Sequence, residues 1–180
     1  MTLPYFIAVE KFGPDAGQAW QEYIAWSGLT HLTEVVSLDI LLCAPVVDEL
    51  TAEDWSYNIQ ENYLTEYFHD LDYLLRRVDT GAPINILAVL LNPEADARPL
   101  WADERFEFLG YDLIELTTGV SALTNCGGFD QAFANEDLSP VGLLATYAGA
   151  RHVQKLLKTH YPDDPHAACD VWAIWRMEQI

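Results

Sequence analysis

The segment "SALTNCGGFDQAF", residues 121–133, contains the side chain best suited to covalent chemistry. Cys126 lies between an asparagine and two glycines, a pattern typical of a tight turn whose backbone N–H groups are open to a substrate. A cysteine nucleophile also needs a base, and His152, in the next predicted helix, is a candidate. One hypothesis is therefore a small cysteine-dependent hydrolase that uses Cys126 with a histidine.

The alternative role of the same turn is structural. Gly127 and Gly128 suit a positive-φ turn, Asn125 can cap it, and Cys126 can pack as a small apolar residue. Acidic neighbours raise the pKa of a thiol and disfavour the reactive thiolate. We therefore expect Cys126 to be structural and the chain to have no catalytic residue.

A second cluster of chemically capable side chains lies in "HYPDDPHAACD", residues 160–170. His160, Asp164 and His166 are of the types that bind zinc. Their spacing matches no standard zinc motif, and two prolines favour a loop that ends a helix. We expect no metal and no other cofactor.

The charge of the chain points to a class of partner. The net charge is -19, and no Lys or Arg occurs between Phe12 and Leu75 or between Phe106 and Ala150. Such a field repels nucleic acids and anionic membranes, and it attracts basic proteins or cations. Solubility alone is one explanation, and a docking surface for a basic protein is the other.

The residues expected to bind that partner lie in "TAEDWSYNIQENYLTEYFHDLDYLLRRVDTG", residues 51–81. Apolar residues from Trp55 to Val78 recur at helical spacing, and Arg76 and Arg77 followed by Gly81 indicate a helix end. The pattern predicts one long helix. Its outward face would carry the carboxylates of Glu53, Asp54, Glu61 and Asp72, opposite the apolar stripe.

The remaining segments predict a single α+β domain over residues 1–180. Strands are expected at 3–12, 33–47, 84–92, 105–116 and 169–180, with helices at 14–26, 51–81 and 139–160. Gly110 is expected to mark a β-bulge. The result is a mixed β-sheet with about three helices, in the order β-α-β-α-β-β-α-β.

The cysteines and the hydropathy pattern indicate a cytoplasmic protein. Cys43, Cys126 and Cys169 are widely spaced and odd in number, which favours reduced thiols over a disulfide framework. No apolar run reaches the roughly 18 residues of a membrane span, and the first residues lack the pattern of a secretory signal.

Four segments within residues 105–178, "FLGYDLIE", "SALTNCGG", "SPVGLLATYAGA" and "HAACDVWAIWRM", together resemble small acidic bacterial proteins of the polymorphic-toxin immunity type. The resemblance implies a cytosolic, non-enzymatic binder of a toxin domain, encoded beside the toxin that it blocks. Together with the charge, it predicts an immunity or inhibitor protein for a basic toxin or enzyme domain. We expect no binding to nucleic acid or membrane, and the oligomeric state stays open.

Overall fold

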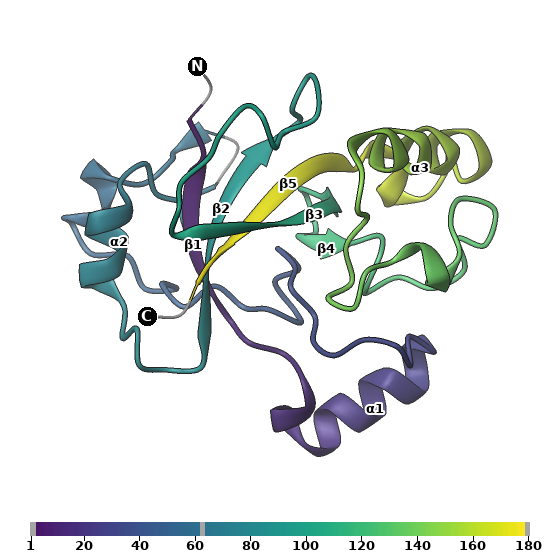
Figure 1. Cartoon of the computed structure of the whole chain (residues 1–180), viewed down its shortest axis with the longest axis horizontal. Coiled ribbons are helices and arrows are strands. Elements are labelled where there is room, and N and C mark those ends of the chain that lie inside the picture. Colours follow the sequence, from purple (N-terminus) through teal and green to yellow (C-terminus); the bar gives the residue numbers. More distant parts are fainter. Residues whose placement is uncertain (1–2, 62–63, 179–180) are drawn as a thin grey trace.

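The computed structural model describes residues 3–61 and 64–178. Residues 1–2, 62–63 and 179–180 lie outside the described residues, and with them parts of the predicted helix 51–81 and of the last predicted strand, 169–180. One five-stranded sheet forms the centre of the molecule (Figure 1), in the order β1-β2-β5-β3-β4. Its strands are β1 (Tyr5–Glu10), β2 (Ile84–Leu91), β3 (Phe106–Glu115), β4 (Val120–Ser121) and β5 (Asp170–Met177).

The predicted α+β class is confirmed, but the sheet differs from the predicted one. Every pairing between the described strands is antiparallel, so the sheet is not mixed. The central strands β2 and β5 are buried over most of their length, which explains their nearly continuous apolar sequences. The predicted bulge is present as a register shift between Phe108 and Gly110. Gly110 has a φ of +142°, and an added Cβ would lie 2.6 Å from the Leu144 carbonyl oxygen.

Three α-helices flank the sheet in the described part of the chain: α1 (Gln18–Ser27), α2 (Leu71–Arg77) and α3 (Tyr147–His160). In Figure 1, α2 lies beside β1, whereas α3 lies where β5 begins. Gly28, in the left-handed region, ends α1. The helix predicted from residue 139 begins only at Tyr147, with Thr146 as its N-cap. Among residues 3–61 and 64–178, each helix is too short or too polar to cross a bilayer.

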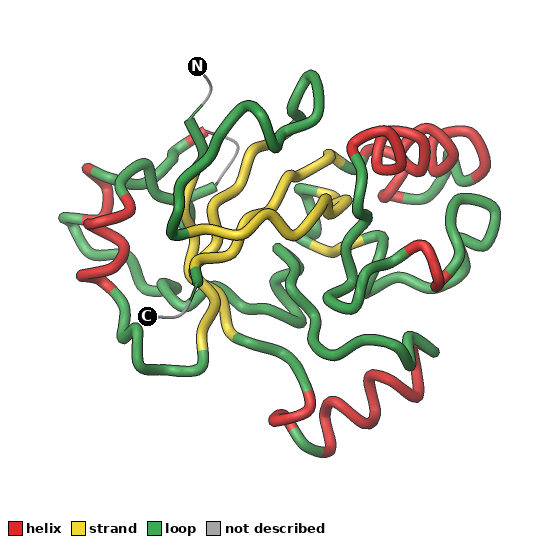
Figure 2. Tube along the Cα trace, in the orientation of Figure 1, coloured by secondary structure: helices red, strands yellow, loops and turns green. Residues whose placement is uncertain are grey.

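The prediction of one long helix over 51–81 was wrong. Figure 2 shows mostly loop between α1 and α2. The described residues of 51–70 include a 3-10 turn at Asp54–Ser56 but no α-helix, and α2 begins only at Leu71. Long-range contacts replace the helix. The backbone of Phe68 exchanges two hydrogen bonds of 2.8 Å with Phe6 of β1, and the Tyr67 ring stacks on Trp172 of β5 at 5.4 Å. Tertiary contacts that no local periodicity describes thus bury much of the apolar stripe, including Ile59, Tyr67 and Leu74, but leave Trp55 exposed.

The strand predicted over 33–47 was also wrong. This segment makes only isolated bridges, Phe12 with Val35 and Val9 with Pro45. It turns at Asp39, whose carboxylate accepts hydrogen bonds from the backbone N–H groups of Leu41 and Leu42. Part of its apolar sequence, including Val35, Val36 and Leu38, is buried without joining the sheet as a strand, whereas Ile40 and Leu41 are exposed.

Candidate functional site

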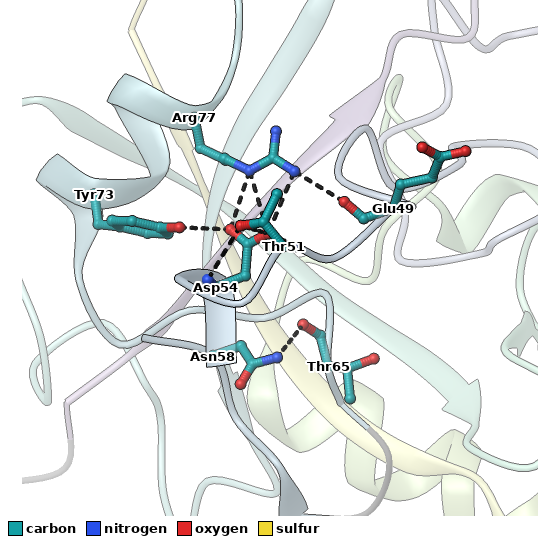
Figure 3. Close-up of polar contacts among 7 residues, drawn as sticks. All are labelled: Glu49, Thr51, Asp54, Asn58, Thr65, Tyr73 and Arg77. Carbon is teal, nitrogen blue, oxygen red and sulfur yellow. Dashed lines mark hydrogen bonds and ion pairs between the residues drawn. The ribbon is translucent and has the colours of Figure 1, made fainter. Parts of the chain in front are cut away.

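Asp54, expected on an outward face, is buried against α2 (Figure 3). The Tyr73 hydroxyl donates to its Oδ1 at 2.6 Å, and Arg77 Nε donates to the same oxygen at 3.0 Å. The Thr51 backbone N–H donates to Oδ2 at 2.6 Å. Burial alone raises the pKa of Asp54, but the hydrogen bonds from Arg77, Tyr73 and Thr51 outweigh it and hold the pKa far below its ordinary value. Asp54 is an internal anchor that no partner can reach in this fold.

The other predicted docking residues do not share one helix face. Glu53, Glu61 and Asp72 are exposed, but only Asp72 lies on an α-helix. Glu53 lines a shallow surface pocket together with Arg76 and Arg77. The negative charge of Glu53 is therefore offset by the guanidinium groups of Arg76 and Arg77.

The structure places His166, and not His152, beside Cys126. The Cys126 sulfur lies 3.6 Å from Nδ1 of His166, and Oδ1 of Asp164 lies 2.9 Å from the same nitrogen. His152 is exposed on α3 and lines a different pocket. The predicted Cys126–His152 pair is therefore not formed.

The Cys126–His166–Asp164 contact has the residue types of a catalytic triad without its geometry. In a working triad, the nucleophile and the carboxylate contact opposite ring nitrogens of the histidine. Here both approach Nδ1, while Nε2 is buried without a hydrogen-bond partner among the described residues. Burial, followed by the charges of Asp164 and Asp39, raises the pKa of Cys126. The arrangement disfavours a thiolate and a general base at neutral pH.

The three residues considered for a metal do not converge. His160 is exposed at the end of α3, whereas Asp164 caps the 3-10 turn Pro165–Ala168 by accepting from the His166 backbone N–H at 2.9 Å. Over the part of the chain that the structure describes, no three His, Cys, Asp or Glu side chains are grouped as metal ligands. The helix-stopping loop expected from the prolines is present.

A pocket of about 220 Å³ opens between the end of α1 and the loop that contains Cys126. We call it the α1–loop pocket. Its walls include Trp26, Cys126, Phe129, Asp130 and Phe133. Every lining residue falls within 26–29 or 123–135, so all of them come from the two stretches that contain no Lys or Arg.

Those two stretches, residues 12–75 and 106–150, are called the acidic segments below, and folding joins them directly. The Thr33 backbone N–H donates to the Pro140 carbonyl at 2.8 Å, and the Val36 N–H donates to the Val141 carbonyl at 3.0 Å. The Ser37 hydroxyl donates to the buried carboxylate of Asp112 at 2.5 Å. The two acidic segments are therefore in direct contact, although they are far apart in the sequence.

Several of the arginines form ion pairs with carboxylates of the same chain. Ion pairs form between Arg77 and Asp54, Arg98 and Asp96, Arg105 and Asp103, and Arg176 and Glu34. Within the described residues, Glu34 and Asp54 are the members of the acidic segments that pair with a Lys or Arg. The exposed carboxylates of these segments, such as Glu22 and Asp130, keep their charge uncompensated by such a pair.

Sequence reasoning missed Trp26, whose side chain is 60% exposed. A signal was present in the helix predicted at 14–26. At 100° per residue, Trp26 lies about 100° from the direction shared by Trp20, Tyr23 and Ile24, which face the core. Its exposure could therefore have been anticipated, but the convergence with Phe133 and Asp130 depends on the fold.

No protein-family model matches this chain, and neither a curated protein nor a solved structure does. Its function has to be inferred from its own surfaces and chemistry.

Proposed function

We propose that the protein is a cytoplasmic protein-binding module of the immunity or inhibitor type, which neutralises a basic toxin or enzyme domain. The observation that carries this proposal is the union of the two acidic segments around an exposed tryptophan. A domain that acts on nucleic acid carries matching charge, because it must hold phosphate with Lys and Arg.

The surface best suited to this role is the docking face, which we define by the exposed residues Glu22, Trp26, Asp130 and Glu136. Glu22 lies one turn before Trp26 on α1 and therefore shares its side of the helix. Asp130 lines the α1–loop pocket, and Glu136 directly follows Asn135, another lining residue. A large aromatic side chain with carboxylates around it is the composition expected of an anchor with a polar rim.

The proposed mechanism is competition between this protein and nucleic acid for the basic side chains of the partner. Carboxylates of the docking face pair with the partner's Lys and Arg, which are then unavailable to phosphate. Long-range attraction speeds the encounter, and salt screens it. The aromatic anchor contributes mainly to the lifetime of the complex, because buried aromatic contacts slow dissociation.

The direct test reverses charge on the docking face. The variant Glu22→Lys/Asp130→Lys/Glu136→Lys should associate with the product of the neighbouring gene at least about 10-fold more slowly than wild type at low salt. Its association rate should also depend less steeply on salt. Stopped-flow mixing over a series of NaCl concentrations measures both quantities.

A matched control reverses the same number of charges near α2. The variant Glu53→Lys/Glu61→Lys/Asp72→Lys changes the net charge equally, and we expect a smaller loss of rate because Arg76 and Arg77 already weaken the field there. An equal loss in both variants would assign the effect to net charge alone. The proposal fails if the neighbouring product does not bind, or if the docking-face variant associates as fast as wild type.

A further inference from the structure

The exposed Trp26 side chain is the wall of a defined pocket and not an isolated surface aromatic. Tryptophan is mostly buried in folded proteins, but here 60% of it is exposed. Phe133, which is partly buried, and Phe129, which is buried, line the same α1–loop pocket. Together they provide aromatic surface to a ligand, with a volume of about 220 Å³ that suits a single side chain.

The charge of the pocket selects a cation. Asp130 is the one charged residue among the described residues that line it, and Lys, Arg and His are absent from that lining. Cys126, another lining residue, also lies near negative charge: its pKa is raised mainly by burial and to a smaller extent by the carboxylates of Asp164 and Asp39. An anionic group would meet these negative charges at short range without a counter-ion.

We propose that the α1–loop pocket receives an arginine side chain of the basic partner, an assignment that rests on the proposed function above. A guanidinium group is planar, stacks on aromatic faces and donates paired N–H groups to a carboxylate. Trp26 and Phe133 offer the faces, and Asp130 offers the carboxylate. The methylene stem of arginine packs on the remaining apolar wall.

A short peptide tests the pocket without the full partner. The probe is N-acetyl-Gly-Arg-Gly-amide, titrated into ¹⁵N-labelled protein while the indole N–H signals of the tryptophans are followed by NMR. Replacing Trp26 by Phe in a separate sample identifies its signal. We expect a saturable shift of the Trp26 indole and of the Gly127 and Gly128 amides. The same peptide with citrulline, which keeps the shape without the charge, should cause no saturable shift.

Three variants locate the binding. Trp26→Ala and Asp130→Asn should each weaken the arginine peptide about 2- to 5-fold, the range expected for one exposed cation–π or ion-pair contact. Trp55→Ala is the matched control, because Trp55 is 49% exposed but lies on the turn before α2. It should leave the affinity unchanged. All three side chains are exposed, so folding should be preserved in each variant, which the NMR spectrum itself verifies.

The possible outcomes separate this inference from the proposed function. The arginine assignment is overturned if the shift of the Trp26 signal does not saturate, or if Trp26→Ala binds the arginine peptide as tightly as wild type. It is also overturned if the peptide with citrulline, or the same peptide with lysine, binds as tightly as the arginine peptide. A second outcome is that charge reversal abolishes binding to the neighbouring product while Trp26→Ala and Asp130→Asn still bind it normally. This outcome would refute the arginine assignment and support the proposed function. Arginine-peptide binding that depends on Trp26 and Asp130 supports the pocket even if the neighbouring product fails to bind.

Discussion

Asp54 and Asp112 are both fully buried carboxylates, but they are satisfied in different ways. Asp54 accepts a hydrogen bond from a guanidinium, Arg77, at 3.0 Å. Asp112 accepts from neutral donors, the hydroxyls of Ser37 at 2.5 Å and Ser121 at 2.6 Å. The difference decides which protonation state each site stabilises.

The two sites consequently have opposite pKa shifts. At Asp54, donors that include a positive charge outweigh the effect of burial, and the pKa is lowered. At Asp112, burial is the largest effect, the hydroxyls of Ser121 and Ser37 oppose it only in part, and the pKa is raised. One region should therefore lose stability in acid, whereas the other loses stability as the pH rises.

Both carboxylates hold segments that lack regular structure. Asp54 fastens the turn before α2 to that helix, and Arg77 Nη2 also donates to the Glu49 carbonyl at 2.8 Å (Figure 3). Asp112 on β3 fastens residues 37–38 through the Ser37 hydroxyl and the Leu38 backbone N–H. Side-chain hydrogen bonds supply there the order that a backbone ladder supplies in the sheet.

The largest effect should come from removing the charged partner of Asp54. Arg77→Met should lower the free energy of unfolding by about 2–4 kcal/mol, because it leaves a buried carboxylate without its cation. The value lies toward the low end of the range for buried pairs because the Arg77 side chain is 30% exposed. Urea denaturation at neutral pH measures it.

Arg76→Met is the control for this substitution. Arg76 is the preceding residue of α2 and is exposed, with its guanidinium 5.8 Å from the centre of the Tyr73 ring. Its loss should cost no more than about 1 kcal/mol. Equal losses in the two variants would contradict the role assigned to the Arg77–Asp54 pair.

The pH dependence of the Arg77→Met variant is a second test of the Arg77–Asp54 pair. A lowered folded pKa means that the stability from Asp54 is fully present above the unfolded value of about 3.9 and is lost as the pH falls through the folded pKa. Without Arg77 the folded pKa rises. The variant should therefore begin to change its stability at a higher pH than wild type does, which urea titrations between pH 3 and 7 would detect.

The next effect concerns a neutral donor at Asp112. Ser121→Ala removes the 2.6 Å hydrogen bond to Asp112 and leaves the Leu123 backbone N–H, which donates to the Ser121 hydroxyl at 3.1 Å, without that acceptor. We expect a loss of about 1–2 kcal/mol at neutral pH. The loss should be smaller in acid, where Asp112 is protonated, than at a pH above its raised pKa, where it is ionised. An equal loss in the two protonation states would contradict the description of this site.

A smaller and pH-dependent effect is expected for Asp112→Asn. Since the folded pKa of Asp112 is raised, wild-type stability from this site is greatest below about 3.9 and declines as the pH rises through the folded pKa. The amide cannot ionise, so the variant lacks this decline. It should be about 1 kcal/mol less stable than wild type at pH 4, for the lost hydrogen bond, and should compare more favourably at pH 7.

Asp54 and Asp112 also show where sequence patterns failed to predict the structure. The buried run at 84–92, the bulge at Gly110 and the end of α1 at Gly28 were predictable, because each depends on local hydropathy or on one backbone conformation. The helix at 51–81 and the strand at 33–47 were wrong. Asp54 and Asp112 bind side chains 19 to 75 residues away, and no local spacing reveals such partners.

The candidate site was predictable to a similar extent. The two stretches without basic residues were visible in the sequence, but their union around Trp26 was not. Asp54 has the same chemical type as exposed Asp72, and only the fold shows that Arg77, Tyr73 and Thr51 enclose it. His166 was considered as a metal ligand, and its contact with Cys126 depends on how residues 160–170 fold back over the loop.

The smallest effect should follow Cys126→Ser, which closely matches the size of the side chain and keeps a polar atom beside His166. Cys126 is only partly buried, and an added Cβ at Gly127 or Gly128 would meet no atom within 4 Å, so the loop is not tightly packed there. We expect a stability change within about 0.5 kcal/mol. The raised pKa also predicts that iodoacetamide alkylates Cys126 near pH 7 more slowly than it alkylates a free cysteine peptide. Mass spectrometry of the peptide that contains Cys126 measures the rate, and urea denaturation measures the stability. Rapid, selective alkylation of Cys126 coupled to loss of an enzymatic activity would instead favour a cysteine-dependent enzyme, with His166 in place of His152 as the base.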